Sequence, residues 1–279
     1  MEAKGALLNP EKSLWVSLFL FFAALFFLYF PILKKLAYDW WHDPNYSHGL
    51  VLPFFSAYLV WLKKKELAQE SPRATWWGLP MVGAGLFLLL LGWVAGEQFT
   101  QRFSFLVVLY GGLVFLLGWP LARKLLFPVW ILVFAIPIPY VIYNTLTFPL
   151  KLLATKLATN LLQLVGVSVY RDGNIIILPN TTLEVVDACS GIRSLISLLA
   201  ICSILAYFVR KPLWKIVLIL SAVPIAIGVN VLRIFVTGLL ANEFGAKAAE
   251  GFFHTFSGLL VFLISLLLVF LIHQLVKNR

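Results

Sequence analysis

The strongest candidate for a catalytic residue lies at a junction between a polar segment and an apolar one. The run from Glu184 to Ser194 joins a polar segment of strand character to a long apolar stretch and contains Cys189. If a helix begins near Ala188, the Cys189 thiol lies in its first turn, where unpaired N–H groups and the helix dipole favour a thiolate. Arg193 follows four residues later on the same helix face, where its charge stabilises a thiolate further. The sequence therefore predicts a nucleophilic cysteine at this junction.

The elements that must position this thiol are membrane helices. The chain has 279 residues, of which 61% are hydrophobic and only 12% are charged. A soluble domain could not bury that much apolar surface, so the composition predicts a membrane protein with several spans. The formal charge of +10 comes mostly from Lys and Arg clusters between apolar stretches. We interpret these clusters as orientation signals rather than as a surface that binds nucleic acid.

The apolar stretches predict an all-α polytopic protein with about eight spans in a single domain of residues 1–279. The predicted spans are 14–33, 48–62, 77–95, 103–119, 125–143, 188–209, 213–240 and 252–273. The positive-inside rule assigns the basic clusters at 63–65, 123–124, 210–215 and 277–279 to the cytoplasm. Both termini are then cytoplasmic, and the Cys189 end of its span lies on the extracytoplasmic side of the cytoplasmic (inner) membrane.

Two segments before Cys189 do not have the pattern of ordinary spans. Segment 148–167 is apolar but is interrupted by lysines and polar residues, so we expect an interfacial or re-entrant helix. Segment 167–186 contains three β-branched runs separated by turn clusters, which predicts an extracytoplasmic hairpin or a three-stranded element. An irregular loop is the alternative for this second segment.

Three polar residues of the last spans are expected at one depth of the membrane. Cys189 begins one span at its outer end, Arg233 lies about two turns before the outer end of the next, and His254 begins the last span. An arginine within a span costs roughly 2.5–3.5 kcal/mol, so such residues are usually paired or line a wet cavity. Together these side chains could supply a nucleophile, a base that activates it and a fixed positive donor for an oxyanion. Each residue alone has a structural explanation, and the shared depth favours the functional one.

Further candidates surround this group. The substrate-binding candidates are Arg193, Ser190, Asn230, His48, Tyr46 and Arg102. Cys202 lies in the middle of an apolar run, which predicts a packing role. The histidines and aspartates of loop 39–48 have no specific metal spacing, and we expect neither a metal nor a cofactor.

Four motifs of the chain resemble those of the exosortase/archaeosortase family. The run Ala188–Ser194 is similar to the cysteine signature, Asn230–Ile234 to the arginine motif and Phe253–Gly258 to the histidine motif. The run Asp43–Gly49 resembles the N-terminal motif of bacterial members. The resemblance extends over nearly the whole chain, and the motifs occur in the expected order.

This resemblance implies a membrane-embedded cysteine transpeptidase. By the resemblance, Cys189 is the nucleophile, His254 the acid/base and Arg233 the group that stabilises the transition state. The implied substrates are exported proteins with a C-terminal tail, which consists of a short motif such as Pro-Glu-Pro, an apolar span and a basic cluster. The acceptor nucleophile is not specified, and such systems accompany exopolysaccharide production. The alternative from a different class is a non-enzymatic transporter or scaffold of a polysaccharide export system.

Overall fold

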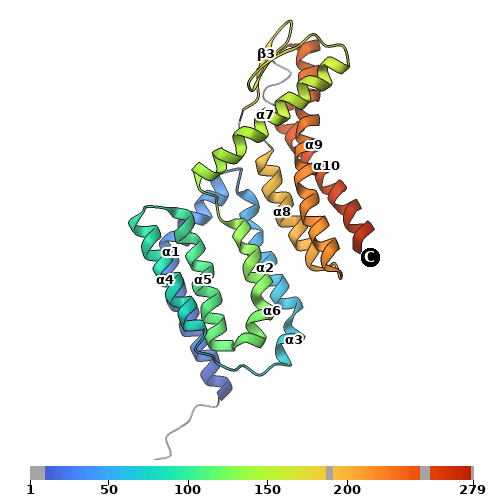
Figure 1. Cartoon of the computed structure of the whole chain (residues 1–279). Coiled ribbons are helices and arrows are strands. Elements are labelled where there is room, and N and C mark those ends of the chain that lie inside the picture. The colour runs from blue at the N-terminus through green and yellow to red at the C-terminus, as the bar shows by residue number, and fades with distance from the viewer. Residues whose placement is uncertain (1–9, 187–190, 246–251, 278–279) are drawn as a thin grey trace, which may run out of the picture. The chain divides into compact units, whose positions relative to one another are not determined.

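The computed structural model describes residues 10–186, 191–245 and 252–277, with the side chains of residues 10–12 and 252–256 outside the description. The chain divides into two compact units, residues 1–139 and residues 140–279, which are described separately below (Figure 1). Both units are built mainly from apolar helices.

In residues 10–139, the regular elements of the first unit are all helices. They are α1 (Pro10–His42), the short 3₁₀ helix η1 (Ser47–Leu50), α2 (Leu52–Leu62), α3 (Lys64–Ala68), α4 (Gly78–Val94), α5 (Gln98–Leu117), α6 (Trp119–Trp130) and the 3₁₀ helix η2 (Ile131–Ala135). The α4 and α5 helices approach closely because three glycines recur every seven residues on α4, at 78, 85 and 92. A Cβ atom at Gly78 would lie 2.3 Å from the backbone nitrogen of Phe115, and one at Gly92 would lie 2.8 Å from that of Gln101. Small residues of this kind let helix backbones pack directly on each other in a membrane.

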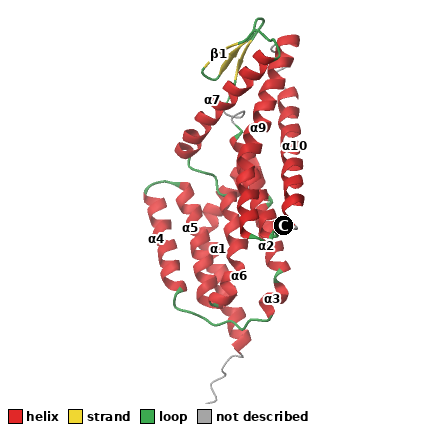
Figure 2. Cartoon of the chain, turned by 45° about the vertical axis from the view of Figure 1, so that its right-hand side comes forward, coloured by secondary structure: helices red, strands yellow, loops and turns green. Residues whose placement is uncertain are grey.

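The second unit combines four helices with a small sheet. Its elements are α7 (Tyr140–Leu164), β1 (Tyr170–Asp172), β2 (Ile175–Ile177), β3 (Thr182–Glu184), α8 (Ile192–Tyr207), α9 (Pro212–Phe244) and α10 (Phe252–Lys277). The strands pair antiparallel in the order β1-β2-β3. The sheet lies beside α7 (Figure 2), so the expectation of a three-stranded element within residues 167–186 is confirmed.

Two apolar cores hold this second unit together. One joins the sheet to α7 and α9 and consists of Ala154, Ala158, Leu162, Ile176, Leu178, Val185, Val231, Ile234 and Ala241. The other joins α8, α9 and α10 and includes Cys202, which is fully buried among apolar side chains. Because α9 contributes to both cores, it ties the sheet to the last helices of the chain.

The described helices support a membrane protein without confirming the number of spans. Four helices are long and apolar enough to cross a membrane, namely those within 13–42, 98–117, 212–244 and 257–277, and up to five cross if one bent pair counts as a span. Three shorter apolar helices lie at 47–62, 78–94 and 192–207. The count of about eight spans therefore stays a prediction.

The region expected to hold the fifth span and a separate interfacial helix differs from the prediction. The helical segment 119–135 ends, and α7 begins only at Tyr140, so the two are separate helices of the chain. Pro137 and Pro139 fall in this break, where they lack the N–H groups that would continue a helix. In the structure, residues 140–147 belong to the same helix as residues 148–164. The span 125–143 and the interfacial or re-entrant placement of 148–167 stay predictions.

Candidate functional site

The N-terminus of α8 lies later in the chain than the sequence suggested. The helix begins at Ile192, and Gly191 at its N-cap has a left-handed backbone with φ of 81°. A residue in this conformation interrupts the helical repeat, so the expectation of a helix that begins near Ala188 is wrong. Cys189 and Ser190 lie outside the described residues, and in the sequence they directly precede this N-cap.

The backbone of Gly191 packs against Asn230 of α9. A Cβ atom at Gly191 would lie 3.2 Å from both Cβ and Cγ of Asn230 and 3.3 Å from its Nδ2 atom. Asn230 is buried, with 3% of its surface exposed. Glycine is therefore favoured twice, by the left-handed conformation and by the close contact. The contact brings the arginine motif of α9 next to the chain that follows Cys189.

Arg233 connects α9 to α10. It lies three residues after Asn230, so both side chains project from the same side of the helix. Its Nε–H group donates a hydrogen bond to the Ser257 hydroxyl at 3.3 Å, and its guanidinium carbon lies 3.9 Å from the Cβ position of Gly258. A guanidinium offers five N–H donors in a fixed plane, and this contact uses one of them to orient the others.

The histidine of the last motif belongs to the first turn of α10. His254 precedes Ser257 by three residues and Gly258 by four along the chain. The side chain of His254 lies outside the described residues. Gly191, two residues after Cys189, thus contacts Asn230 of α9, and Ser257, three residues after His254, contacts Arg233 of the same helix.

The remaining candidate of the second unit is Arg193. It is the second residue of α8 and is partly buried. Arg193 lies in the first turn of α8, two residues after Gly191 in the sequence. Its role in binding a substrate stays a prediction.

In the first unit, His48 stabilises the end of η2. His48 donates from Nε2 to the carbonyl of Phe134 at 3.0 Å, and Trp40 donates from its indole nitrogen to the carbonyl of Ala135 at 2.7 Å. The Pro137 ring nitrogen, three residues after Phe134, cannot donate to that carbonyl. The two side chains therefore supply donors at the end of η2. The sequence analysis missed this role of Trp40, although the prolines that follow η2 indicate carbonyl groups that need donors from elsewhere. Tyr46, two residues before His48 in the sequence, is buried.

Arg102 forms an ion pair within the first unit. Its guanidinium donates to the Asp39 carboxylate of α1 and, at 3.0 Å, to the Gln98 side-chain oxygen. Only 4% of Arg102 is exposed. This pair connects α1 to α5, and the sequence analysis missed Asp39 as the partner. Among the described residues, no group of three or more His, Cys, Asp or Glu side chains is arranged to hold a metal ion.

Comparison with known protein families gives one match. The model of the transmembrane exosortase family (Exosortase_EpsH) matches residues 40–271. This range begins at Trp40, includes the four motifs and covers most of the chain. Comparisons with curated proteins and with solved structures found no match. With its long apolar helices, the chain is a multi-pass membrane protein, and it belongs to the transmembrane exosortase family.

Proposed function

We propose that this protein is a cysteine transpeptidase that cleaves the C-terminal sorting signals of membrane-anchored exported proteins through a thioester on Cys189. Membership of the exosortase family suggests a membrane transpeptidase for sorting signals. The observation that carries the proposal is the convergence of three motifs, through the Gly191–Asn230 contact and the Arg233–Ser257 hydrogen bond. Such a convergence supports a single reactive site, because its parts come from three different helices.

The chemistry assigned to these residues is acyl transfer in two steps. The Cys189 thiolate attacks the carbonyl carbon of the scissile peptide, and the carbonyl oxygen becomes an oxyanion. Arg233 donates hydrogen bonds to this oxyanion from its oriented guanidinium. The tetrahedral intermediate collapses, the C–N bond breaks, and His254 gives a proton to the leaving amine. The resulting thioester is resolved by an acceptor nucleophile or by water, which frees the thiol.

The substrate in this proposal is held by the membrane as well as by the site. Its tail carries a short motif such as Pro-Glu-Pro, then an apolar span, then a basic cluster. With the basic end in the cytoplasm, the scissile peptide lies at the extracytoplasmic surface of the inner membrane, at the depth proposed for Cys189. Both termini of the enzyme are cytoplasmic in this orientation, and the cleaved proteins accompany exopolysaccharide production.

The test compares the two cysteines of the chain. Each is replaced by alanine in cells or membranes that contain a reporter protein with such a tail, and processing is followed by gel mobility and mass. Cys189→Ala should abolish processing and leave uncut reporter in the membrane. Cys202→Ala is the matched control, because Cys202 is buried in an apolar core and should tolerate a small apolar replacement.

Normal processing by Cys189→Ala would contradict the proposal. A non-enzymatic role in polysaccharide export would then explain the chain better. Loss of processing in both variants, with both proteins folded and inserted, would also count against a specific role for Cys189.

A further inference from the structure

One edge of β3 is hydrogen-bonded to β2. Val185 donates its N–H to the carbonyl of Asn174 at 2.9 Å, and Leu178 donates to the carbonyl of Thr181 at 2.8 Å. Hydrogen-bonded pairs alternate along an antiparallel ladder, so every second residue directs its backbone groups to the neighbouring strand. Residues 181, 183 and 185 therefore face β2 with their N–H and C=O groups.

The outer edge of β3 is open. Thr182 and Glu184 direct their backbone groups away from β2, and both residues are exposed, as is Val186 with 45% of its surface accessible. Within the described part of the chain, no other strand pairs with this edge. An exposed strand edge with unpaired N–H and C=O groups is a template for pairing with another polypeptide.

The opposite edge of the sheet is partly occupied by the chain itself. At the start of β1, the carbonyl of Val169 accepts a hydrogen bond from the Gln163 side chain of α7 at 3.2 Å. Arg171 directs its backbone groups outward from β1, because its partner Ile176 uses its own groups toward β3. The two edges therefore differ, and the β3 edge is the more accessible one.

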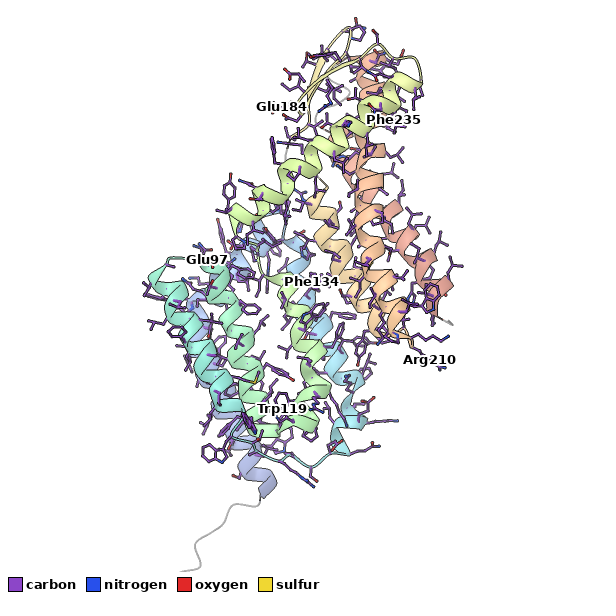
Figure 3. All side chains as sticks on the ribbon, viewed as in Figure 1. Glu97, Trp119, Phe134, Glu184, Arg210 and Phe235 are labelled. Atoms are coloured by element: carbon purple, nitrogen blue, oxygen red, sulfur yellow. The ribbon has the colours of Figure 1, made fainter. Side chains whose placement is uncertain are left out.

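The open edge is anchored to the helix that carries Arg233. Ile176 and Val185 on the inner face of the sheet pack with Val231 and Ile234 of α9. Figure 3 labels Glu184 on the sheet and Phe235 on α9, which packs against this core. Cys189 follows Glu184 by five residues, which span at most about 17 Å at roughly 3.3 Å per residue. A polypeptide bound at this edge therefore lies within reach of the proposed nucleophile.

We infer that the free edge of β3 binds an extended segment of the substrate, next to the scissile peptide, as a fourth strand of the sheet. The inference rests on the proposed function, because it assigns the substrate of that reaction to this edge. Main-chain hydrogen bonds hold an added strand with little dependence on side chains, and an extended chain presents its carbonyl groups for attack. One edge could then accept substrates of differing sequence.

A substrate segment fits the edge better than a second copy of this chain. Asp172, Ile175 and Glu184 lie in one cross-strand row, so the exposed face of the sheet carries a carboxylate on each of its two edge strands. Edge-to-edge pairing of two copies would place further carboxylates beside them, which is unfavourable. The edge lies within reach of Cys189 along the chain, which favours a substrate segment as its occupant.

A proline scan tests the backbone of this edge. Glu184→Pro removes the outward N–H group but no ladder hydrogen bond, so it should raise KM about three- to tenfold and leave kcat nearly unchanged. Glu184→Ala keeps the N–H group and should raise KM less than Glu184→Pro does. Arg171→Pro makes the same backbone change on the opposite edge and should also leave KM unchanged. Equal KM values for Glu184→Pro and Glu184→Ala would overturn the inference.

Cross-linking tests the strand directly, even if the proline variant folds poorly. In a Cys189→Ala and Cys202→Ala background, Thr182→Cys is combined with a reporter that carries one cysteine at successive positions near its motif. A paired strand should give disulfides at alternating positions, and Glu184→Cys should shift that pattern by two residues. Cross-links without alternation, or homodimers linked through Thr182→Cys without reporter, would overturn the inference.

The same reporter separates the two proposals. If the wild-type protein does not cut it, the proposed function fails. If the wild type cuts it and the strand pattern is absent, only the edge assignment fails.

Discussion

The two units of the chain use their polar side chains in different ways. In residues 1–139, the side chains of Trp40, His48 and Arg102 contact backbone carbonyls or a carboxylate of the same unit. In residues 140–279, motif residues meet where glycine permits close approach, with Gly191 against Asn230 and Gly258 beside Arg233. The difference indicates that the first unit uses its polar residues to fix helix ends and pairings. The second unit brings polar residues from several helices to one place, as the proposed acyl transfer requires.

The largest effect expected from this comparison is at Arg233. Arg233→Lys should lower kcat for tail cleavage about 10²–10³-fold, because a single ammonium cannot reproduce the oriented guanidinium donors at an oxyanion. Arg210→Lys is the control, since Arg210 is an exposed residue that precedes α9 (Figure 3). Initial rates of reporter cleavage measure both variants. Full activity of Arg233→Lys would remove Arg233 from the oxyanion role.

The next effect concerns stability rather than chemistry. Arg102→Met leaves the Asp39 carboxylate without its cation and should lower the free energy of unfolding by about 2–3 kcal/mol. Adding Asp39→Leu removes that carboxylate and should restore most of the loss, as thermal unfolding in detergent would show. KM of the double variant decides whether Arg102 also binds substrate. A value that stays raised after stability returns would make Arg102 a substrate-binding residue and weaken the contrast between the units.

A smaller effect is expected at the N-cap of α8. Gly191→Ala forces a Cβ atom into the left-handed region and against Asn230, at a cost of about 1–2 kcal/mol. Gly173→Ala is matched, because Gly173 has φ of 59° with no atom within 4 Å of its Cβ position. Both variants should lose similar stability, measured by thermal unfolding, but only Gly191→Ala should lose cleavage activity. Equal activities would show that the Gly191–Asn230 contact does not serve the site.

The smallest effect is a pH-dependent change in stability at Glu97, the N-cap residue of α5. Glu97 accepts hydrogen bonds from the backbone N–H groups of Phe99 and Thr100 at 2.8 and 2.6 Å. Burial alone would raise the pKa of Glu97, but the Thr100 and Phe99 hydrogen bonds and the Arg102 charge outweigh it and lower the pKa below its usual 4.5. The stabilisation is therefore complete above about pH 4.5 and is lost as the pH falls through the lowered value.

Glu97→Gln removes this dependence. The variant should be less stable than the wild type by about 0.5–1 kcal/mol near neutral pH, and the difference should shrink in acid. Thermal unfolding across this pH range measures it. A constant difference at all pH values would show that the Glu97 charge does not contribute.

The sequence predicted the elements whose pattern is local. The three strands fall within 167–186, and α9 and α10 begin within one residue of their predicted starts, because long apolar runs bounded by turn or charged residues define them well. The family resemblance was confirmed by the match over residues 40–271. The motif residues that it singled out include Asn230 and Arg233, which the described structure places at the meeting of three helices.

Features that depend on distant contacts could not be predicted in this way. The Asp39–Arg102 pair joins residues 63 positions apart, and no local pattern indicates it. The start of α8 was placed too early because no sequence pattern shows that Gly191 has a left-handed backbone where it packs against Asn230. A span was expected to continue to residue 143, whereas the helical segment ends at Ala135, just before two prolines in three residues.

The most direct test of the central claim is to trap the acyl-enzyme. Wild-type protein is mixed with the tailed reporter, quenched in acid and digested, and the peptide that contains Cys189 is analysed by mass. The reporter fragment on the N-terminal side of the cut should be attached to Cys189 by a thioester, which hydroxylamine removes. Cleavage of the reporter with Cys189 unmodified throughout the reaction, or the same cleavage by Cys189→Ala, would contradict it.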